Sequence, residues 1–194
     1  MILFRVLYSI SFFVKLLFYK VFGRLENLHF SYKNHCGKGV YMEFAKGSVI
    51  SLGQDIGLRD SVRLLVRQGA NLSIGDNVFI NTDCLFVVHK SLQIGAKTKF
   101  GPRVMIFDHD YDFRVKGGVS SKIYKEEEII IGSNCWIGAG VTLLRGTVIG
   151  DNSVVGAGCV LKGKYPSNSL IIQKRETETR SIINDNDGKT FVSF

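Results

Sequence analysis

Residues 131–161 read IGSNCWIGAGVTLLRGTVIGDNSVVGAGCVL. A branched aliphatic residue recurs at every sixth position of this stretch, and glycine follows it in most repeats; the aliphatic positions are Ile131, Ile137, Leu143, Ile149, Val155 and Leu161. A period of six fits neither an amphipathic helix nor an alternating strand. It fits short strands joined by glycine-tolerant corners, three to a coil, with stacked coils burying a continuous aliphatic column. The sequence therefore predicts an all-β fold, a triangular parallel β-helix.

The same pattern extends toward the N-terminus and is interrupted once. It is clear from Leu72 onward, whereas residues 28–67 show it only faintly, which predicts early coils in loose register. Eight residues separate Phe86 from Ile94 where six are expected, so a bulge falls near His89. Residues 108–128 are far too many for one repeat and are expected to leave the coils as a long loop, a feature that is usually functional. We expect the β-helix domain to span residues 28–165, followed by a C-terminal tail over residues 166–194.

The first 27 residues predict an amphipathic helix. Aliphatic and aromatic residues dominate residues 1–22, interrupted by Arg5, Lys15 and Lys20. The longest uncharged run, residues 6–14, is shorter than the roughly 20 apolar residues that a spanning helix needs. Two interpretations stay open. The helix could lie on an acidic membrane surface, or it could cap the solenoid or pack against another subunit.

Charge and cysteine content restrict the classes of partner. The formal net charge of +8 favours anionic partners such as cofactor phosphates, acidic lipids or an acidic glycan, and no nucleic-acid-binding module is recognisable. The four cysteines, Cys36, Cys84, Cys135 and Cys159, lack the paired spacing of zinc or redox motifs. We interpret them as small buried hydrophobic residues in a reducing compartment.

His109 is the candidate catalytic base. It stands where a coil ends and the long loop begins, flanked by Asp108, Asp110 and Asp112. Histidine can accept a hydroxyl proton near neutral pH, and a neighbouring carboxylate can orient its ring and stabilise the imidazolium. Asp108 and Asp110 are both candidates for that carboxylate.

Four motifs in this order resemble the hexapeptide-repeat acetyltransferases, with capsule and O-antigen O-acetyltransferases nearest in pattern. The motifs begin at Ile74 (IGDNVFIN), Phe107 (FDHDYD), Ile131 (IGSNCWIGA) and Ile149 (IGDNSVVGAG). The resemblance covers about residues 72–175. It implies a left-handed β-helix, acetyl-CoA as acyl donor, a glycan or sugar acceptor, and a homotrimer with its sites between subunits. It also implies that His109 is the catalytic histidine.

The resemblance also assigns binding residues by motif position. Asn81 and Phe79 match acceptor-binding positions, and Trp136 matches a position near the acceptor and the pantetheine arm. The remaining cofactor-binding candidates are Gly138, Ala139, Gly156, Ala157, Lys162 and Arg175. An asparagine or a small residue can equally serve a coil corner. The histidines lack the zinc-binding spacing of the related γ-type carbonic anhydrases, so we expect no metal and interpret His89 as structural or acceptor-facing.

These features together predict an acetyl-CoA-dependent O-acetyltransferase that modifies a hydroxyl of a bacterial surface glycan, with His109 as general base. The alternatives are an acyltransferase with an acyl-carrier-protein donor or a small-molecule acceptor, and a non-catalytic glycan-binding β-helix. The expected location is the cytoplasm, with peripheral contact to the inner face of the cytoplasmic membrane if residues 1–22 bind lipid.

Overall fold

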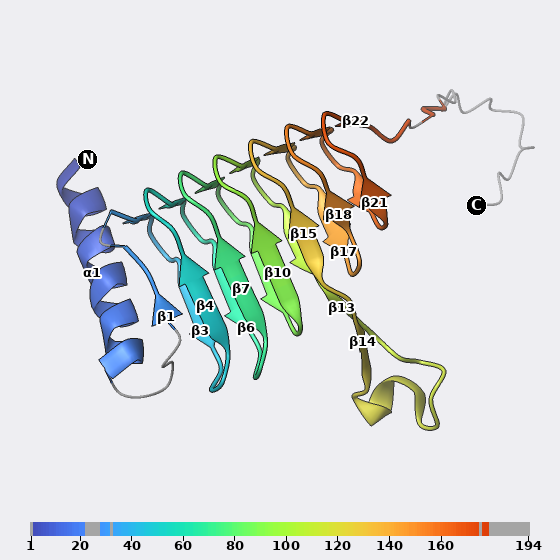
Figure 1. Ribbon diagram of the computed structural model, residues 1–194, viewed down its shortest axis with the longest axis horizontal. Coiled ribbons are helices and arrows are strands. Elements are labelled where there is room, and N and C mark those ends of the chain that lie inside the picture. Colours follow the sequence, from blue (N-terminus) through green and yellow to red (C-terminus); the bar gives the residue numbers. More distant parts are fainter. Residues whose placement is uncertain (1, 22–27, 32, 175, 179–194) are drawn as a thin grey trace, which may run out of the picture.

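The computed structural model describes residues 2–21, 28–31, 33–174 and 176–178. Stacked coils form a solenoid, with one helix at its N-terminal end and a hairpin projecting from its side (Figure 1). Successive strands of a coil enter three different parallel sheets, which we call A, B and C in chain order. The predicted parallel β-helix with one long loop is confirmed, and the arrangement is consistent with the left-handed form.

The three sheets share the strands as follows. Sheet A contains β1 (Leu28–His29), β4 (Val49–Leu52), β7 (Asn71–Ile74), β10 (Ser91–Ile94), β15 (Ile129–Ile131), β18 (Val148–Ile149) and β21 (Lys164–Tyr165). Sheet B contains β2 (His35–Cys36), β5 (Gly57–Leu58), β8 (Phe79–Ile80), β11 (Lys99–Phe100), β16 (Trp136–Ile137), β19 (Val154–Val155) and β22 (Leu170–Ile171). Sheet C contains β3 (Tyr41–Phe44), β6 (Arg63–Val66), β9 (Leu85–Val88), β12 (Met105–Phe107), β17 (Thr142–Leu144) and β20 (Val160–Leu161).

Strand register explains why the six-residue period is faint before Leu72. In the first coils, paired residues are 22 positions apart, as Leu28 with Ile50 and Ile50 with Leu72. The repeat is 20 positions between β7 and β10 and 18 between β15 and β18. Four-residue strands in sheets A and C take up the extra residues of the early coils. The early coils are therefore regular but longer, and the loose register predicted for residues 28–67 is wrong.

Inward-facing side chains form one continuous apolar column. Burial alternates along the strands, as in β7, where Leu72 and Ile74 are buried and Asn71 and Ser73 are exposed. Phe86 and Phe100 are fully buried in it, with ring centroids 5.3 Å apart. All four cysteines are free and buried, and burial raises the pKa of the Cys84 thiol to about 11. These thiols therefore contribute to packing.

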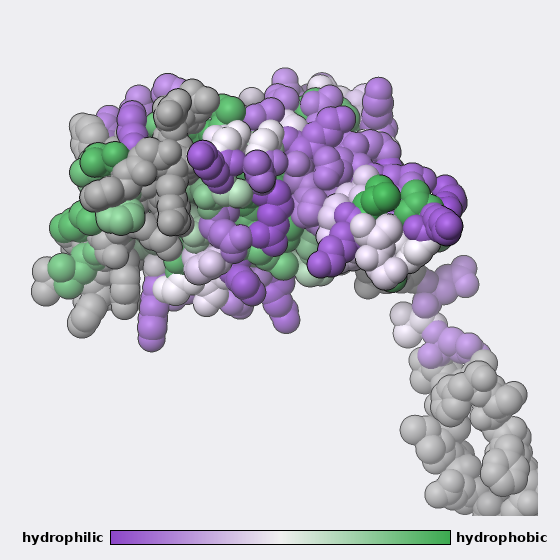
Figure 2. All heavy atoms as spheres, turned by 90° about the horizontal axis from the view of Figure 1, so that it is seen from below, coloured by the Kyte–Doolittle hydropathy of each residue, from purple (hydrophilic) through white to green (hydrophobic). Residues whose placement is uncertain are grey.

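The N-terminal helix α1 (Ile2–Val21) closes the first coil. It buries Phe12 and Leu16 in the core, and the Phe13 ring meets Phe30 edge-on at 5.5 Å. The packing alternative of the sequence analysis is thus what the structure shows for this face. The opposite face leaves apolar side chains at the surface of this end of the molecule (Figure 2); they are Leu7, Ile10, Val14, Leu17, Phe18 and Val21. Among the described residues, no helix has the length and hydropathy required to cross a bilayer.

The C-terminal end of the solenoid lies further along the chain than the sequence predicts. Tyr165-Pro166 does not end the repeat, because Leu170 and Ile171 form β22 and pair with β19. Pro166 aligns with Gly150, whose N–H donates to the following coil, and among the described residues no further sheet A strand follows Pro166 to accept such a bond. Residues 179–194 of the predicted tail lie outside the described residues.

Candidate active site

The candidate base lies on the edge where each sheet C strand turns into the next sheet A strand, which we call the C–A corner. β12 pairs with β9 in a register that, continued past the strand ends, aligns Asp108 with Val88 and His109 with His89. Side chains alternate along a strand, so the first pair points inward and the second outward. Val88 and Asp108 are both fully buried. A carboxylate therefore occupies a core position directly beside His89 and His109, two histidines that are far apart from each other in the sequence.

The buried Asp108 carboxylate is fully supplied with donors. Its Oδ1 accepts a hydrogen bond from the backbone N–H of His89 at 2.8 Å. Its Oδ2 accepts from the backbone N–H groups of Lys90 at 2.7 Å and Ser91 at 2.9 Å. Burial by itself raises the pKa of Asp108, but the hydrogen bonds from His109 and these three amides outweigh it and lower the pKa below its usual value. The group is therefore an ionised carboxylate near neutral pH.

Asp108 also fixes the tautomer of His109. The His109 Nδ1 atom lies 3.3 Å from Oδ1 of Asp108. An ionised carboxylate can only accept hydrogen bonds, so Nδ1 must carry the proton. In the neutral ring Nε2 then keeps its lone pair, which is the form that a general base requires. Asp110, the other candidate carboxylate, pairs instead with Nε of Arg145 at 2.6 Å.

A second imidazole covers one face of the candidate base. The rings of His89 and His109 are stacked, with centroids 3.6 Å apart and planes inclined by 12°. The Nδ1 atom of His89 is 3.5 Å from Oε1 of Glu126, and its ring meets Tyr124 edge-on at 4.8 Å. Burial, followed by the nearby His109, lowers the pKa of His89 despite the opposing effect of Asp108 and Glu126.

The loop that begins at His109 is an ordered hairpin fixed to the solenoid. β13 (His109–Tyr111) pairs antiparallel with β14 (Tyr124–Glu126), and a short 3-10 helix (Gly118–Ser121) lies between them. Arg145, from the coil that follows the loop, binds both Asp110 and Glu127, one at each side of the hairpin base. Its side chain is only 14% exposed, so this contact sits within the structure. The hairpin base is therefore held against the corner that carries His109.

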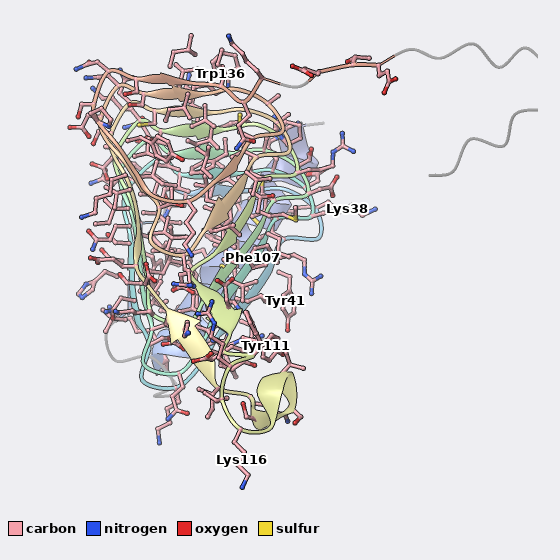
Figure 3. All side chains as sticks on the ribbon, turned by 90° about the vertical axis from the view of Figure 1, so that its right-hand side faces the viewer. Lys38, Tyr41, Phe107, Tyr111, Lys116 and Trp136 are labelled. Atoms are coloured by element: carbon pink, nitrogen blue, oxygen red, sulfur yellow. The ribbon has the colours of Figure 1, made fainter. Side chains whose placement is uncertain are left out.

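The other predicted binding residues lie elsewhere on the chain. Phe79 and Trp136 are on the outer face of sheet B, where Trp136 is 60% exposed. A second group lies on the corner between sheets B and C, which we call the B–C corner: Asn81, Gly138, Ala139, Gly156 and Ala157. A sheet C strand of about 13 Å separates this corner from His109. Figure 3, viewed along the solenoid, accordingly shows Trp136 at the opposite end from Tyr111 and Lys116 of the hairpin. One chain does not bring the two groups together.

Local structure accounts for several residues of the B–C corner. The Asn81 side chain accepts a hydrogen bond from the backbone N–H of Thr82 at 2.8 Å, as a corner asparagine does. A Cβ on Gly138 would lie 2.7 Å from the backbone nitrogen of Ala157, so coil stacking itself requires glycine there. Lys162 lies on the C–A corner, away from this group, and Arg175 lies outside the described residues.

The sequence analysis did not identify Arg145, Glu126 or Tyr124 as neighbours of the site. The unequal spacing near His89 was the available signal for the histidine pair, because it marks a corner at the same edge as the loop. Within the described ranges, no group of three or more His, Cys, Asp or Glu side chains is arranged to hold a metal ion.

Comparison with known proteins agrees with the repeat pattern. The family model "Bacterial transferase hexapeptide (six repeats)" matches residues 128–163. A galactoside O-acetyltransferase of Lactococcus lactis is 33% identical over 128 residues, covering 63% of this chain and 58% of that protein. A putative lipopolysaccharide biosynthesis O-acetyltransferase of Escherichia coli K12 is 34% identical over 104 residues, covering 50% and 53% respectively.

A comparison with solved structures gives a protein of the same class. The crystal structure of a maltose O-acetyltransferase from Clostridium difficile aligns with a TM-score of 0.52 at 27% identity, covering 77% of this chain and 66% of that one. The chain spans little more than half the length of the two curated relatives described above. The resemblance to hexapeptide-repeat acetyltransferases is confirmed by these matches.

Proposed function

We propose that this chain is an acetyl-CoA-dependent O-acetyltransferase that acetylates a sugar hydroxyl of a bacterial surface glycan, either capsule or O-antigen. The observation that carries the proposal is the pairing of His109 with the buried, ionised Asp108. It leaves Nε2 free to accept a proton on a corner beside a long hairpin. The similarity to proteins named galactoside and lipopolysaccharide O-acetyltransferases supports a sugar acceptor.

The reaction follows from this geometry. The acceptor hydroxyl oxygen attacks the thioester carbonyl carbon while Nε2 of His109 takes the hydroxyl proton. Asp108 stabilises the imidazolium that forms. When the tetrahedral intermediate collapses, the carbon–sulfur bond breaks and Nε2 returns the proton to the CoA sulfur. The products are the acetyl ester and the CoA thiol, and the histidine is neutral again.

We further propose that a neighbouring copy in a homotrimer completes the site. Apart from Lys162, which lies on the C–A corner, the described candidate cofactor residues are at least a strand away from His109, so a groove between copies would bring the two groups together. In this arrangement Trp136, Gly138, Ala139, Gly156, Ala157, Lys162 and Arg175 bind the cofactor, and Asn81 and Phe79 contact the acceptor.

The outer face of sheet C supports an interface between copies. One in-register row on this face carries four apolar residues in succession, Leu65, Val87, Phe107 and Leu144, next to Glu43 on the preceding strand. The corresponding row on sheet A is polar in the same coils, at Ser51, Ser73 and Gln93, and becomes apolar only further along, at Ile130 and Val148. An extended apolar strip on one side of a solenoid is typical of an interaction surface.

The interface is tested by a pair of charge substitutions. Leu65→Lys should abolish the species with three times the 21.6 kDa chain mass in light scattering, whereas Ser73→Lys on sheet A should leave it intact. Equal masses for both variants would contradict an interface on sheet C.

A membrane contact through α1 is proposed for the exposed helix face. Six apolar side chains, from Leu7 (52% exposed) to Val21 (67%), lie on the face opposite to the buried Phe12 and Leu16. The first 25 residues contain basic residues and no acidic one, which suits anionic lipid head groups. The protein would then act as a peripheral enzyme at the cytoplasmic face, where a lipid-linked glycan could reach it.

Vesicle co-sedimentation tests the membrane contact. The double variant Ile10→Asn/Leu17→Asn keeps the buried face intact and should lose binding to phosphatidylglycerol vesicles. The matched control Val119→Asn/Ile123→Asn changes two exposed apolar residues of the hairpin and should bind like the parent protein. Equal binding of both variants, or equal binding to phosphatidylcholine, would reject the proposal.

The catalytic proposal is tested by His109→Ala, assayed by thiol release from acetyl-CoA with a panel of capsule and O-antigen glycans. We expect a rate loss on the order of 10²–10⁴, the usual contribution of a general base. His29→Ala, at an exposed histidine on β1, is the matched control and should be unaffected. Unchanged transfer by His109→Ala would remove His109 from catalysis. No CoA binding by the parent protein would favour a carrier-protein donor or a non-catalytic glycan-binding β-helix.

A further inference from the structure

We infer that His89 is a positioning residue for His109: its imidazole, stacked on the base and held by the hairpin, fixes the orientation of the His109 ring. The inference rests on the proposed function, since it concerns the same base. It adds a residue whose side chain the proposed reaction does not otherwise use.

The solenoid itself does not require an imidazole at this position. Strand register aligns His89 with Arg67 on the preceding coil and with Ala45 on the coil before that. The N–H groups of Ala45 and Arg67 donate to the carbonyls of Val66 and Val88 in the following coil, at 2.9 and 2.8 Å, whereas the His89 N–H donates to the Asp108 carboxylate. A long basic chain and a single methyl group both fit this corner. The coil therefore does not account for an imidazole at this position, whereas the stacked ring of His109 does.

The stack restricts the motion that would spoil the base. With 3.6 Å between centroids and nearly parallel planes, the His89 ring covers one whole face of His109. The two side chains are only 14% and 16% exposed. Rotation of the His109 ring about its Cβ–Cγ bond would drive its edge into the His89 ring. The stack therefore holds the plane of the ring, and within that plane the contact with Asp108 keeps Nδ1 facing the carboxylate and Nε2 facing outward.

His89 is itself held from two elements. Its backbone N–H binds Asp108, and its ring contacts Glu126 and Tyr124 of β14 on the far side of the hairpin. A closed chain of contacts thus runs from the solenoid through the two rings to the hairpin. The position of the hairpin is thereby linked to the position of the base.

Burial, followed by the proximity of His109, lowers the pKa of His89 and favours its neutral form during the reaction. The charged and titratable groups that face it are Asp108, Glu126, Arg67, Tyr124 and His109. Burial and His109 disfavour its protonation more than the two carboxylates favour it. When His109 takes up the acceptor proton, the stacked neighbour therefore presents a neutral ring face, which attracts a cation, in place of a second positive charge.

The experiment uses nitrogen-15 NMR of the four histidines in the full-length protein, which reports the ring tautomer and needs no acceptor. The variants are His89→Ala, which removes the ring, and His89→Phe, which keeps a flat stacked ring without nitrogen. In the parent protein we expect one tautomer of His109, with the proton on Nδ1. His89→Ala should raise the minor tautomer several-fold, and His89→Phe should restore most of the parent distribution.

Kinetics provide the second readout. With acetyl-CoA and an acceptor identified from the glycan panel, His89→Ala should lower kcat about 10–100-fold with little change in KM for acetyl-CoA, because misplacement of a catalytic group has this order of cost. His89→Phe should recover most of kcat. Unchanged His109 tautomers and kcat in His89→Ala, or equal loss in Ala and Phe variants, would overturn the inference. If no glycan is acetylated, the proposed function fails while the NMR comparison still decides the role of His89.

Discussion

Asp108→Asn is the substitution that tests most directly how the solenoid and the site depend on each other. The side chain keeps its size but exchanges one carboxylate oxygen for an NH₂ group. Asp108 is fully buried, and four donors converge on it, the His109 ring and three backbone amides. The asparagine NH₂ must face two of these donors whichever way the amide is turned.

The magnitude follows from the number of bonds lost. If the NH₂ replaces Oδ2, the amides of Lys90 and Ser91 lose their acceptor; if it replaces Oδ1, the amide of His89 and the ring of His109 do. A hydrogen bond to a charged group contributes about 1.5–3 kcal/mol, so two such losses cost about 3–6 kcal/mol. This is a large part of the roughly 5–15 kcal/mol by which a domain is stable. Asp110→Asn, at a 46% exposed carboxylate, should cost no more than about 1 kcal/mol.

The pH dependence has a definite sign. The pKa of Asp108 is lower in the folded protein than the unfolded value of about 3.9. Its contribution is therefore fully present above pH 3.9 and is lost as the pH falls through the folded pKa. The stability difference between the parent and Asp108→Asn should accordingly be constant near neutral pH and shrink below about pH 4.

The assay is urea unfolding followed by circular dichroism at pH 7 and at pH values approaching 3, together with acetyl transfer at pH 7. Transfer by Asp108→Asn should fall by roughly 10²–10⁴-fold, because an amide can stabilise the wrong His109 tautomer. Two results would refute the reasoning. One is equal unfolding free energies for Asp108→Asn and Asp110→Asn at pH 7. The other is a loss of stability in Asp108→Asn with unchanged transfer, which would separate Asp108 from the chemistry.

Three further predictions concern the solenoid and the hairpin. Phe86→Ala removes a fully buried ring and should lower the unfolding free energy by about 3–5 kcal/mol in urea titrations. Gly101→Ala would put a Cβ 2.6 Å from the backbone nitrogen of Ala139. The urea midpoint of its unfolding should therefore fall clearly below that of Gly47→Ala, where the Cβ would have no atom within 4 Å although φ is +79°. Arg145→Met should increase protease cleavage within residues 112–123 without lowering the unfolding midpoint by more than a few degrees, because it releases the hairpin base and leaves the coils intact.

Much of the fold could be predicted because each coil repeats the same local requirement. An inward aliphatic at every sixth position and a small residue at the corner suffice to specify a triangular coil, and the surplus of residues between Ile106 and Ile131 specifies a loop. The early coils could not be predicted in the same way. Their four-residue strands change the repeat to 22 residues, and a period is recognised only when its length is constant.

The parts of the candidate site that depend on a single residue could be predicted from the sequence. His109 in its acidic setting is visible in the sequence, but its partner is not. Asp108 and Asp110 are equally close to it along the chain, and alternation alone would place both on one face of a strand. Asp108 stays in the core and Asp110 reaches Arg145 because the chain leaves the coil at His109 and enters β13. The stacking of His109 on His89 depends on the number of residues in one particular coil, so it could be recognised only from the strand register of the structure.

The sequence by itself determined the type of coil, the place where the chain leaves it and the histidine at that place. These features depend on short stretches of sequence, whose pattern can be recognised without knowing how the rest of the chain folds. Only the tertiary structure decided which side chains meet across coils: the buried carboxylate next to the candidate base, the second imidazole stacked on it and the arginine that binds both sides of the hairpin base. The distance between two coil corners is set by how many residues each coil contains, and that number varies from 16 to 22 in the coils of this solenoid that lack the hairpin insertion.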